Sequence, residues 1–205
     1  MNLKFGKVEA VHSHYFNAAD CAGIARNIRK LLSKRYGPIV IVCIGTDRST
    51  GDALGPLVGS YLHHFSLPNT FVFGTLERPV HAVNLHDTIE AIEAAYPDAF
   101  LVAVDACLGR PQNVGKICVS EGPVSPGAGV NKQIEPIGNM NITGVVNISG
   151  FMEYSVLQST RLHFVMELAT RIGDALADAL LFRKSIHDRR GSEPAADSSS
   201  FKKSF

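Results

Sequence analysis

The chain has 205 residues, of which 45% are hydrophobic and 19% charged, and its formal net charge is +1. This length predicts one domain or two small ones, and the hydrophobic content is typical of a globular protein with a buried core. The nearly balanced charge gives no electrostatic argument for nucleic acid or an anionic membrane, so we expect neither as a partner.

Cysteine usage and apolar runs exclude further classes. The four cysteines form no CxxC pair, so their spacing does not indicate a zinc site. The first ten residues lack the apolar region of a secretory signal. No uninterrupted apolar run approaches the ~20 residues that a membrane-spanning helix needs. We therefore expect a cytoplasmic protein with reduced thiols.

Helical and strand-like segments alternate along the chain. Residues 1–15 are weakly patterned and form either an edge strand or an irregular segment, and Asn17 is the expected N-cap of the helix that follows. The hydrophobic periodicity predicts the remaining elements. The expected helices are 18–36, 52–65, 84–96 and 155 to about 182, and the expected strands are 39–44, 70–74, 99–106, 115–120 and 140–148.

This order of elements predicts an α/β fold. The apolar runs 39–44 and 99–106 do not alternate with polar residues, which indicates strands that are buried on both faces, as in a parallel sheet. Strands that alternate with helices imply right-handed crossovers and a mostly parallel sheet between two helical layers. We expect residues 1–184 to form one domain and the polar segment 185–205 to form a flexible tail.

Two acidic residues follow apolar strands. Asp52 comes after the strand 39–44 and a short polar turn, and Asp105 ends the strand 99–106. Carboxyl ends of parallel strands meet at one edge of the sheet, so we expect the two carboxylates to converge there. Their repulsion would raise one pKa and leave one shared proton, which suits acid–base hydrolysis of an amide.

Other interpretations of the two acids stay open. Two carboxylates and a nearby His can form a metal site. Each Asp can instead cap a helix, for which Asp52 is well placed because it precedes an apolar helical segment.

The loop 45–51 and a later His supply further candidates. The loop lacks the Gly-Lys-Ser/Thr ending of a P-loop, so nucleotide binding is not favoured. We predict that Thr46, Asp47, Arg48 and His81 contribute to substrate binding. Asp47 and Arg48 can instead pair with each other, or Arg48 can hold a substrate carbonyl or carboxylate. His81 can reach the carboxylates if its loop lies at the same edge, or it can be structural.

The segment 124–132, VSPGAGVNK, is a Gly/Pro loop that can bring backbone close to a ligand. Backbone N–H groups near Gly127 and Gly129 could stabilise a developing oxyanion. Lys132 closes the loop, where it either pairs with a carboxylate or is solvated.

Three motifs carry a resemblance to a known family. The stretches CIGTDRSTGDALGPLVG, VDACLGR and SPGAGVNK resemble the YyaC-type family of bacterial sporulation proteins, and the likeness covers about residues 20–182. The same motifs are more distantly similar to the spore germination endopeptidase, which degrades small acid-soluble spore proteins. That enzyme shares its fold with the maturation endopeptidases of nickel–iron hydrogenases. The resemblance implies a phosphorylase/hydrolase-like three-layer α/β/α sandwich, in agreement with the pattern of elements.

The resemblance also implies a site. Asp52 and Asp105 match the two acidic positions of the germination peptidases, and the Gly/Pro loop enters the site region. In the hydrogenase proteases a later His joins the acids to bind the nickel of the substrate. After Asp105 the chain has His163 and His187, and neither lies in a recognisable ligand motif, so we expect no metal and no other cofactor.

These observations predict an aspartate-dependent endopeptidase that acts on a protein or peptide, such as a small spore protein, in a sporulating cell or spore compartment. The first alternative is a non-catalytic protein that keeps the fold and binds a peptide or partner. The second is an oligomeric structural component whose acids only cap helices. The Ala- and Leu-rich face of residues 162–180 could serve a homo-oligomer or the core, and the core is the favoured interpretation.

Overall fold

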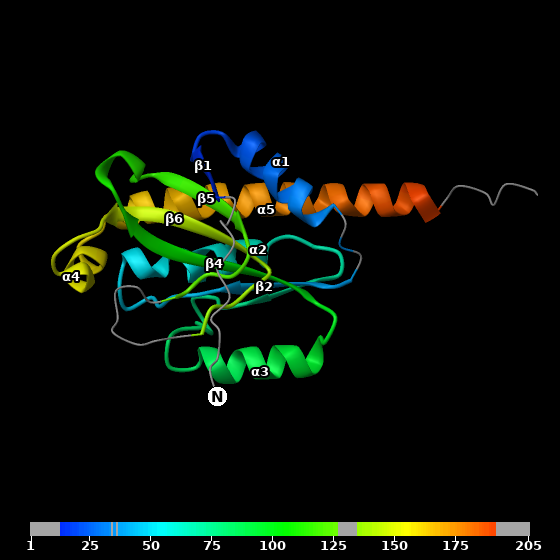
Figure 1. Cartoon of the computed structure of the whole chain (residues 1–205), viewed down its shortest axis with the longest axis horizontal. Coiled ribbons are helices and arrows are strands. Elements are labelled where there is room, and N and C mark those ends of the chain that lie inside the picture. The colour runs from blue at the N-terminus through cyan, green and yellow to red at the C-terminus, as the bar shows by residue number, and fades with distance from the viewer. Residues whose placement is uncertain (1–12, 34, 36, 127–134, 192–205) are drawn as a thin grey trace, which may run out of the picture.

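The computed structural model describes residues 13–33, 35, 37–126 and 135–191. Its centre is a six-stranded sheet in the order β1-β5-β6-β4-β2-β3, with helices on both faces (Figure 1). The fold is therefore the predicted three-layer α/β arrangement. The strands are β1 Ser13–Asn17, β2 Ile39–Cys43, β3 Thr70–Phe73, β4 Phe100–Gly109, β5 Lys116–Glu121 and β6 Met140–Ile148.

The sheet is mostly parallel, as predicted. Strands β3, β2, β4 and β6 run in one direction, so their carboxyl ends share an edge. Strand β5 runs antiparallel to both of its neighbours, β6 and β1. The weakly patterned start of the chain thus contributes an edge strand from residue 13 onward.

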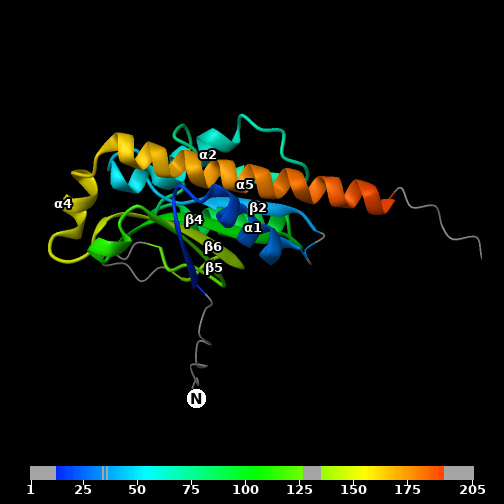
Figure 2. The same cartoon turned by 90° about the horizontal axis from the view of Figure 1, so that it is seen from above.

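Three helices cover one face of the sheet and one helix covers the other. Helices α1 (Cys21–Leu32), α2 (Leu54–Leu62) and α5 (Leu162–Gly191) share a core with the sheet, and α3 (Leu85–Ala95) packs on the opposite face. Figure 2 shows α5 lying across the sheet beside α1 and α2. The remaining elements are the short helix α4 (Glu153–Gln158) and the 3₁₀ turns η1 (Gly51–Ala53) and η2 (Pro111–Asn113).

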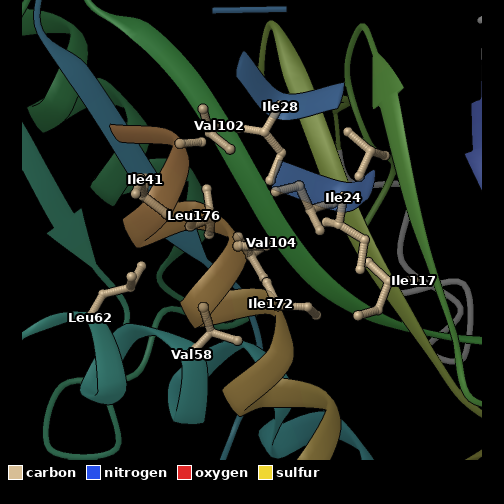
Figure 3. Close-up of a cluster of buried hydrophobic side chains, with 14 of the residues drawn as sticks. Ile24, Ile28, Ile41, Val58, Leu62, Val102, Val104, Ile117, Ile172 and Leu176 are labelled. Carbon is tan, nitrogen blue, oxygen red and sulfur yellow. The ribbon is translucent and has the colours of Figure 1, made fainter. Parts of the chain in front are cut away.

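Both faces of the central strands are buried, which explains their lack of alternation. Ile41 and Val104 contact the larger core, together with Ile172 and Leu176 of α5 (Figure 3). Val42 points to the opposite face, where the smaller core includes Leu85 and Ile92 of α3. A parallel strand between two helical layers has no solvent-facing side, so apolar residues follow one another directly.

The first helix begins later than predicted. Asn17 is not its cap: the Asn17 side chain accepts the Ala19 N–H at 3.0 Å within a turn. Asp20 is the N-cap, because its Oδ1 accepts the Gly23 N–H at 2.9 Å. The Asp20 side chain, three residues after Asn17, therefore sets the start of α1.

The single long helix predicted from residue 155 is wrong, since α4 and α5 are separate helices. The hydroxyls of Ser159 and Thr160 donate to the Val156 carbonyl at 3.2 and 2.8 Å. That carbonyl is the acceptor a continuous helix would offer to the Thr160 N–H, which bonds to Leu157 instead. Side-chain hydroxyls that occupy a helix carbonyl favour such an interruption.

The last helix extends past the predicted domain limit. Its backbone continues to Gly191, beyond the predicted helix end near residue 182. The rest of the predicted tail, 192–205, lies outside the described residues, and the division into one domain and a tail stays a prediction. Within the described ranges, none of the helices combines the length and the apolar character that crossing a membrane requires.

The contact between α5 and the sheet gives the first testable prediction. Leu176 is fully buried in the larger core, so Leu176→Ala should lower the free energy of unfolding by about 2–5 kcal/mol. Leu181 lies on the same helix but is 43% exposed, and Leu181→Ala should cost less than about 1 kcal/mol. Urea unfolding of both variants measures the difference, and equal losses would contradict the assignment of the core.

Candidate functional site

A glycine turn brings Asp52 back to the end of β2. Gly45 has a φ of +140°, and a Cβ at this position would overlap the Asp52 backbone oxygen. The Gly45 N–H donates to the Val80 carbonyl at 2.8 Å, and the Thr46 N–H donates to the Asp52 backbone oxygen at 3.2 Å. Only a residue without a side chain fits between these groups, so the turn is closed tightly enough to place the half-buried Asp52 beside the sheet edge.

Asp105 lies inside β4 and not at its end, which corrects the predicted strand boundary. Cys43, the last residue of β2, pairs with Val104, and Asp105 comes directly after that pair. Strand β4 continues to Gly109 because β6 still pairs with it there. Asp105 thus lies level with the carboxyl end of β2, although it is inside β4. Its side chain is buried, and the residue is only 6% exposed.

The two carboxyl groups interact electrostatically. Burial, and then the negative charge of Asp52, raise the pKa of Asp105 well above its usual range, against the lowering effect of the Ala106 N–H, which donates to Asp105 Oδ1 at 2.8 Å. Burial also raises the pKa of Asp52, against the lowering effects of the Thr46 backbone N–H and of His81. The structure therefore brings the two predicted acids together at one edge, while their catalytic roles stay predictions.

The alternative that each Asp caps a helix is wrong for both residues. Thr50 precedes η1 and Ala53 precedes α2, and neither position makes a side-chain capping bond. Asp52 lies inside η1, and Asp105 lies inside β4, whereas the N-cap of the next helical turn, η2, is Arg110. The burial of these two acids is thus not explained by local helix geometry.

His81 joins the same edge from the loop between β3 and α3. Val80, its neighbour, forms a bridge with Ile44 at the end of β2. The His81 backbone N–H donates to Asn84 Oδ1 at 2.8 Å, and His81 Nδ1 accepts the Val83 N–H at 3.3 Å. A neutral His81 therefore carries its proton on Nε2. Because Val80 bridges Ile44 and its carbonyl accepts the Gly45 N–H, the loop after β3 lies at the edge occupied by Asp52.

The polar turn between β2 and η1 is exposed at Asp47 and Arg48. Thr46 Oγ1 accepts the Arg48 N–H at 3.3 Å and donates to Asp47 Oδ1 at 3.4 Å. The predicted alternative of an Asp47–Arg48 ion pair is not observed among the described residues. Both side chains therefore face solvent close to the acids, and their part in substrate binding stays a prediction.

The remaining candidates Gly127, Gly129 and Lys132 lie outside the described residues. The described ends of that segment are joined, because Val124 and Ile137 exchange two backbone hydrogen bonds of 2.9 Å. In the described ranges, no group of three or more His, Cys, Asp or Glu side chains could hold a metal ion. Asp52, Asp105 and His81 thus do not fit a metal centre.

Two neighbours of the acids were missed from the sequence. Cys107 is half-buried two residues after Asp105 and so lies on the same face of β4. Burial raises the pKa of Cys107 to about 11, with Thr143 opposing the rise. Helix α4 packs against η1, where a Cβ on Gly51 would come within 2.8 Å of the Leu157 side chain. The strand period could have revealed Cys107, whereas no local signal places α4.

Comparisons with known proteins agree with this architecture. The family described as "Protein of unknown function (DUF1256)" matches residues 12–175. The curated protein "Uncharacterized protein YyaC" of Bacillus subtilis (strain 168) is 51% identical over 185 residues, which cover 86% of this chain and 89% of that protein. The predicted resemblance to YyaC-type proteins is confirmed.

A solved structure has a related fold. It is a [NiFe] hydrogenase maturation protease, HycI from Thermococcus kodakarensis KOD1, with a TM-score of 0.53 and 20% identity. The match covers 76% of this chain and 99% of that one. At this identity the likeness concerns the fold alone. The chain therefore belongs to the family described as "Protein of unknown function (DUF1256)", as a relative of YyaC with a fold similar to that of a hydrogenase maturation protease.

Proposed function

We propose that this protein is an aspartate-dependent peptidase in which Asp52 and Asp105 act as a pair. The observation that carries the proposal is the placement of the buried Asp105 and the turn-held Asp52 at one edge of the sheet. Burial and the charge of Asp52 raise the pKa of Asp105 there. Strongly perturbed carboxyl groups of this kind are common at functional sites. The fold likeness to a protein named as a maturation protease supports the proposal without establishing the activity.

The environments of the two acids favour different protonation states. Asp105 is more deeply buried, which favours its neutral form, whereas the Thr46 N–H and His81 favour the charged form of Asp52. Asp52 then acts as the general base and Asp105 as the proton donor.

The proposed reaction conserves protons. Asp52 removes a proton from water while the water oxygen bonds to the substrate carbonyl carbon. Asp105 gives its proton to the amide nitrogen as the carbon–nitrogen bond breaks. Transfer of the proton from Asp52 to Asp105 restores the pair for the next cycle. The products are a carboxylic acid and an amine.

The proposed substrate is a spore or sporulation protein, such as a small acid-soluble spore protein, in the cytoplasm of the sporulating cell or in the spore. Thr46, Arg48 and His81 would position it, Gly127 and Gly129 would supply N–H groups to the oxyanion, and a homo-oligomer is a further expected assembly.

The low exposure of Asp105 favours a second candidate, a non-catalytic protein that holds a peptide at the same edge.

The first test is cleavage of small acid-soluble spore proteins by the purified protein. Asp52→Asn and Asp105→Asn should each reduce the rate about 100-fold or more, because positioned acid–base groups contribute factors of that size. Asp98→Asn is the matched control, since Asp98 is exposed and precedes β4 at the opposite edge of the sheet. Equal cleavage by wild type and the double variant would rule out the pair. Binding without cleavage would favour the second candidate.

The rate of cleavage should depend on pH with a maximum at mildly acidic pH. Above the raised pKa of Asp105 the proton donor is lost, so the rate falls as pH rises. At lower pH Asp52 becomes protonated and stops accepting a proton from water. Steady-state rates between about pH 5 and 8 measure the profile. A flat profile in this interval would argue against a shared proton.

A further test needs no substrate. Between the unfolded pKa of about 3.9 and the raised folded pKa, folded Asp105 keeps a proton that the unfolded chain releases. The free energy of unfolding therefore falls as pH rises through this window. Asp105→Asn removes the titrating group, so its stability relative to wild type should increase with pH. Urea unfolding at several pH values measures this change, with Asp98→Asn as the control. If the difference in unfolding free energy between Asp105→Asn and wild type did not vary with pH, a raised pKa of Asp105 would be ruled out.

A further inference from the structure

Four apolar side chains are exposed between the last residue of β6 and the first turn of α4. Phe151 is 98% exposed, Met152 71%, Tyr154 59% and Ile148 47%. We call these four residues the apolar lip. Single exposed apolar residues are ordinary, but several in one short connection are typical of an interaction surface.

The apolar lip is attached to the edge that holds the acids. Strand β6 is parallel to β4, and Ile148 pairs with Gly109 at the carboxyl end of both strands. The Ser149 N–H donates to the Gly109 carbonyl at 2.8 Å. Helix α4, which includes Tyr154, packs against the η1 turn that carries Asp52. Figures 1 and 2 both show α4 at one end of the molecule and the carboxyl end of α5 at the other.

The backbone of the lip is strained but firmly held. Met152 has a φ of +56° and a ψ of +46°, a left-handed conformation that is rare for a residue other than glycine. Its carbonyl accepts the Val156 N–H at 3.1 Å, and Asn147 Nδ2 donates to Thr160 Oγ1 at 3.1 Å behind it. The strained Met152 backbone leaves a large apolar side chain in water, so burial of that side chain does not compensate for the strain. This points to a function for the Met152 side chain.

We propose that the apolar lip binds apolar side chains of the polypeptide whose backbone reaches Asp52 and Asp105. This inference rests on the proposed function and adds the substrate class, an extended segment with apolar residues beside the bond that is cut. A bound segment can contact both features because α4 and η1 are packed together. The thioether of Met152 and the aromatic rings beside it suit apolar partners of varied shape.

The size of the lip fits a peptide segment better than a second copy of the chain. Four side chains of these types, two of them aromatic, present on the order of 500 Å² of accessible surface. A stable interface between two proteins buries about 800 Å² on each partner. The occupant is therefore a short extended segment.

Peptide binding tests the lip separately from cleavage. The probe is a fluorescein-labelled peptide that contains Leu and Phe, compared with the same peptide carrying Ser in their place. Binding is followed by fluorescence anisotropy in an Asp105→Asn background, so that turnover does not interfere. The apolar peptide should bind at least about tenfold more tightly, and the additional double substitution Phe151→Ser, Met152→Ser should remove this preference. Leu181→Ser, in the second half of α5, should keep it.

Met152→Gly separates a binding role from a structural one. Glycine accepts the left-handed conformation, so the midpoint of thermal unfolding should stay at or above that of wild type. Affinity for the apolar peptide should fall in the same variant. A fall in stability together with unchanged affinity would show that Met152 serves only the fold and would overturn the proposal.

Two further outcomes would overturn the lip, and both differ from failure of the peptidase. Equal peptide binding by wild type and the Phe151, Met152 double variant excludes the lip even if the acids cleave. Light scattering that shows a dimer only when the lip is intact, with unchanged peptide binding, assigns the lip to contacts between copies. Conversely, lip-dependent binding with no cleavage would remove the peptidase and leave the lip as a peptide-binding surface.

Discussion

Two carboxyl groups that share one edge of the sheet are the constraint on which the candidate site depends. Asp52 and Asp105 each lose solvation, and ionising both would add their mutual repulsion. The surrounding fold holds them there through a glycine turn and a central strand that has helices on both sides. A protein can maintain such an unfavourable pair only if the rest of the structure stabilises it, and the two apolar cores supply that stabilisation.

Differences in strand length give this edge its shape. Strand β2 stops at Cys43, while its neighbour β4 continues in its pairing with β6, so Asp105 lies inside β4 one residue past the end of β2. The connections after β2, β3 and β6 carry η1, His81 and α4, respectively. Open parallel sheets place ligand sites at the carboxyl ends of their strands for this reason. The apolar lip extends the same edge with side chains of opposite character.

The relationship to a hydrogenase maturation protease concerns architecture. The fold match covers most of both chains, yet one fold can support many activities. The chemistry must therefore be argued from the side chains at the edge. Their arrangement differs from a metal centre within the described residues, and it separates a buried carboxyl from a half-exposed one. That asymmetry is the feature that general acid–base catalysis requires.

The amino-acid sequence by itself determined the class of fold, the existence of the strands β2 and β4, and the choice of Asp52 and Asp105 as candidates, because continuous apolar runs and turn residues are local signals. Only the tertiary structure decided that Asp105 is interior to β4, since strand length depends on how far β6 pairs with it. It also decided that Asp52 caps no helix and that α4 breaks away from α5 to lie against η1. These outcomes come from contacts between residues far apart in the chain, which no local pattern encodes.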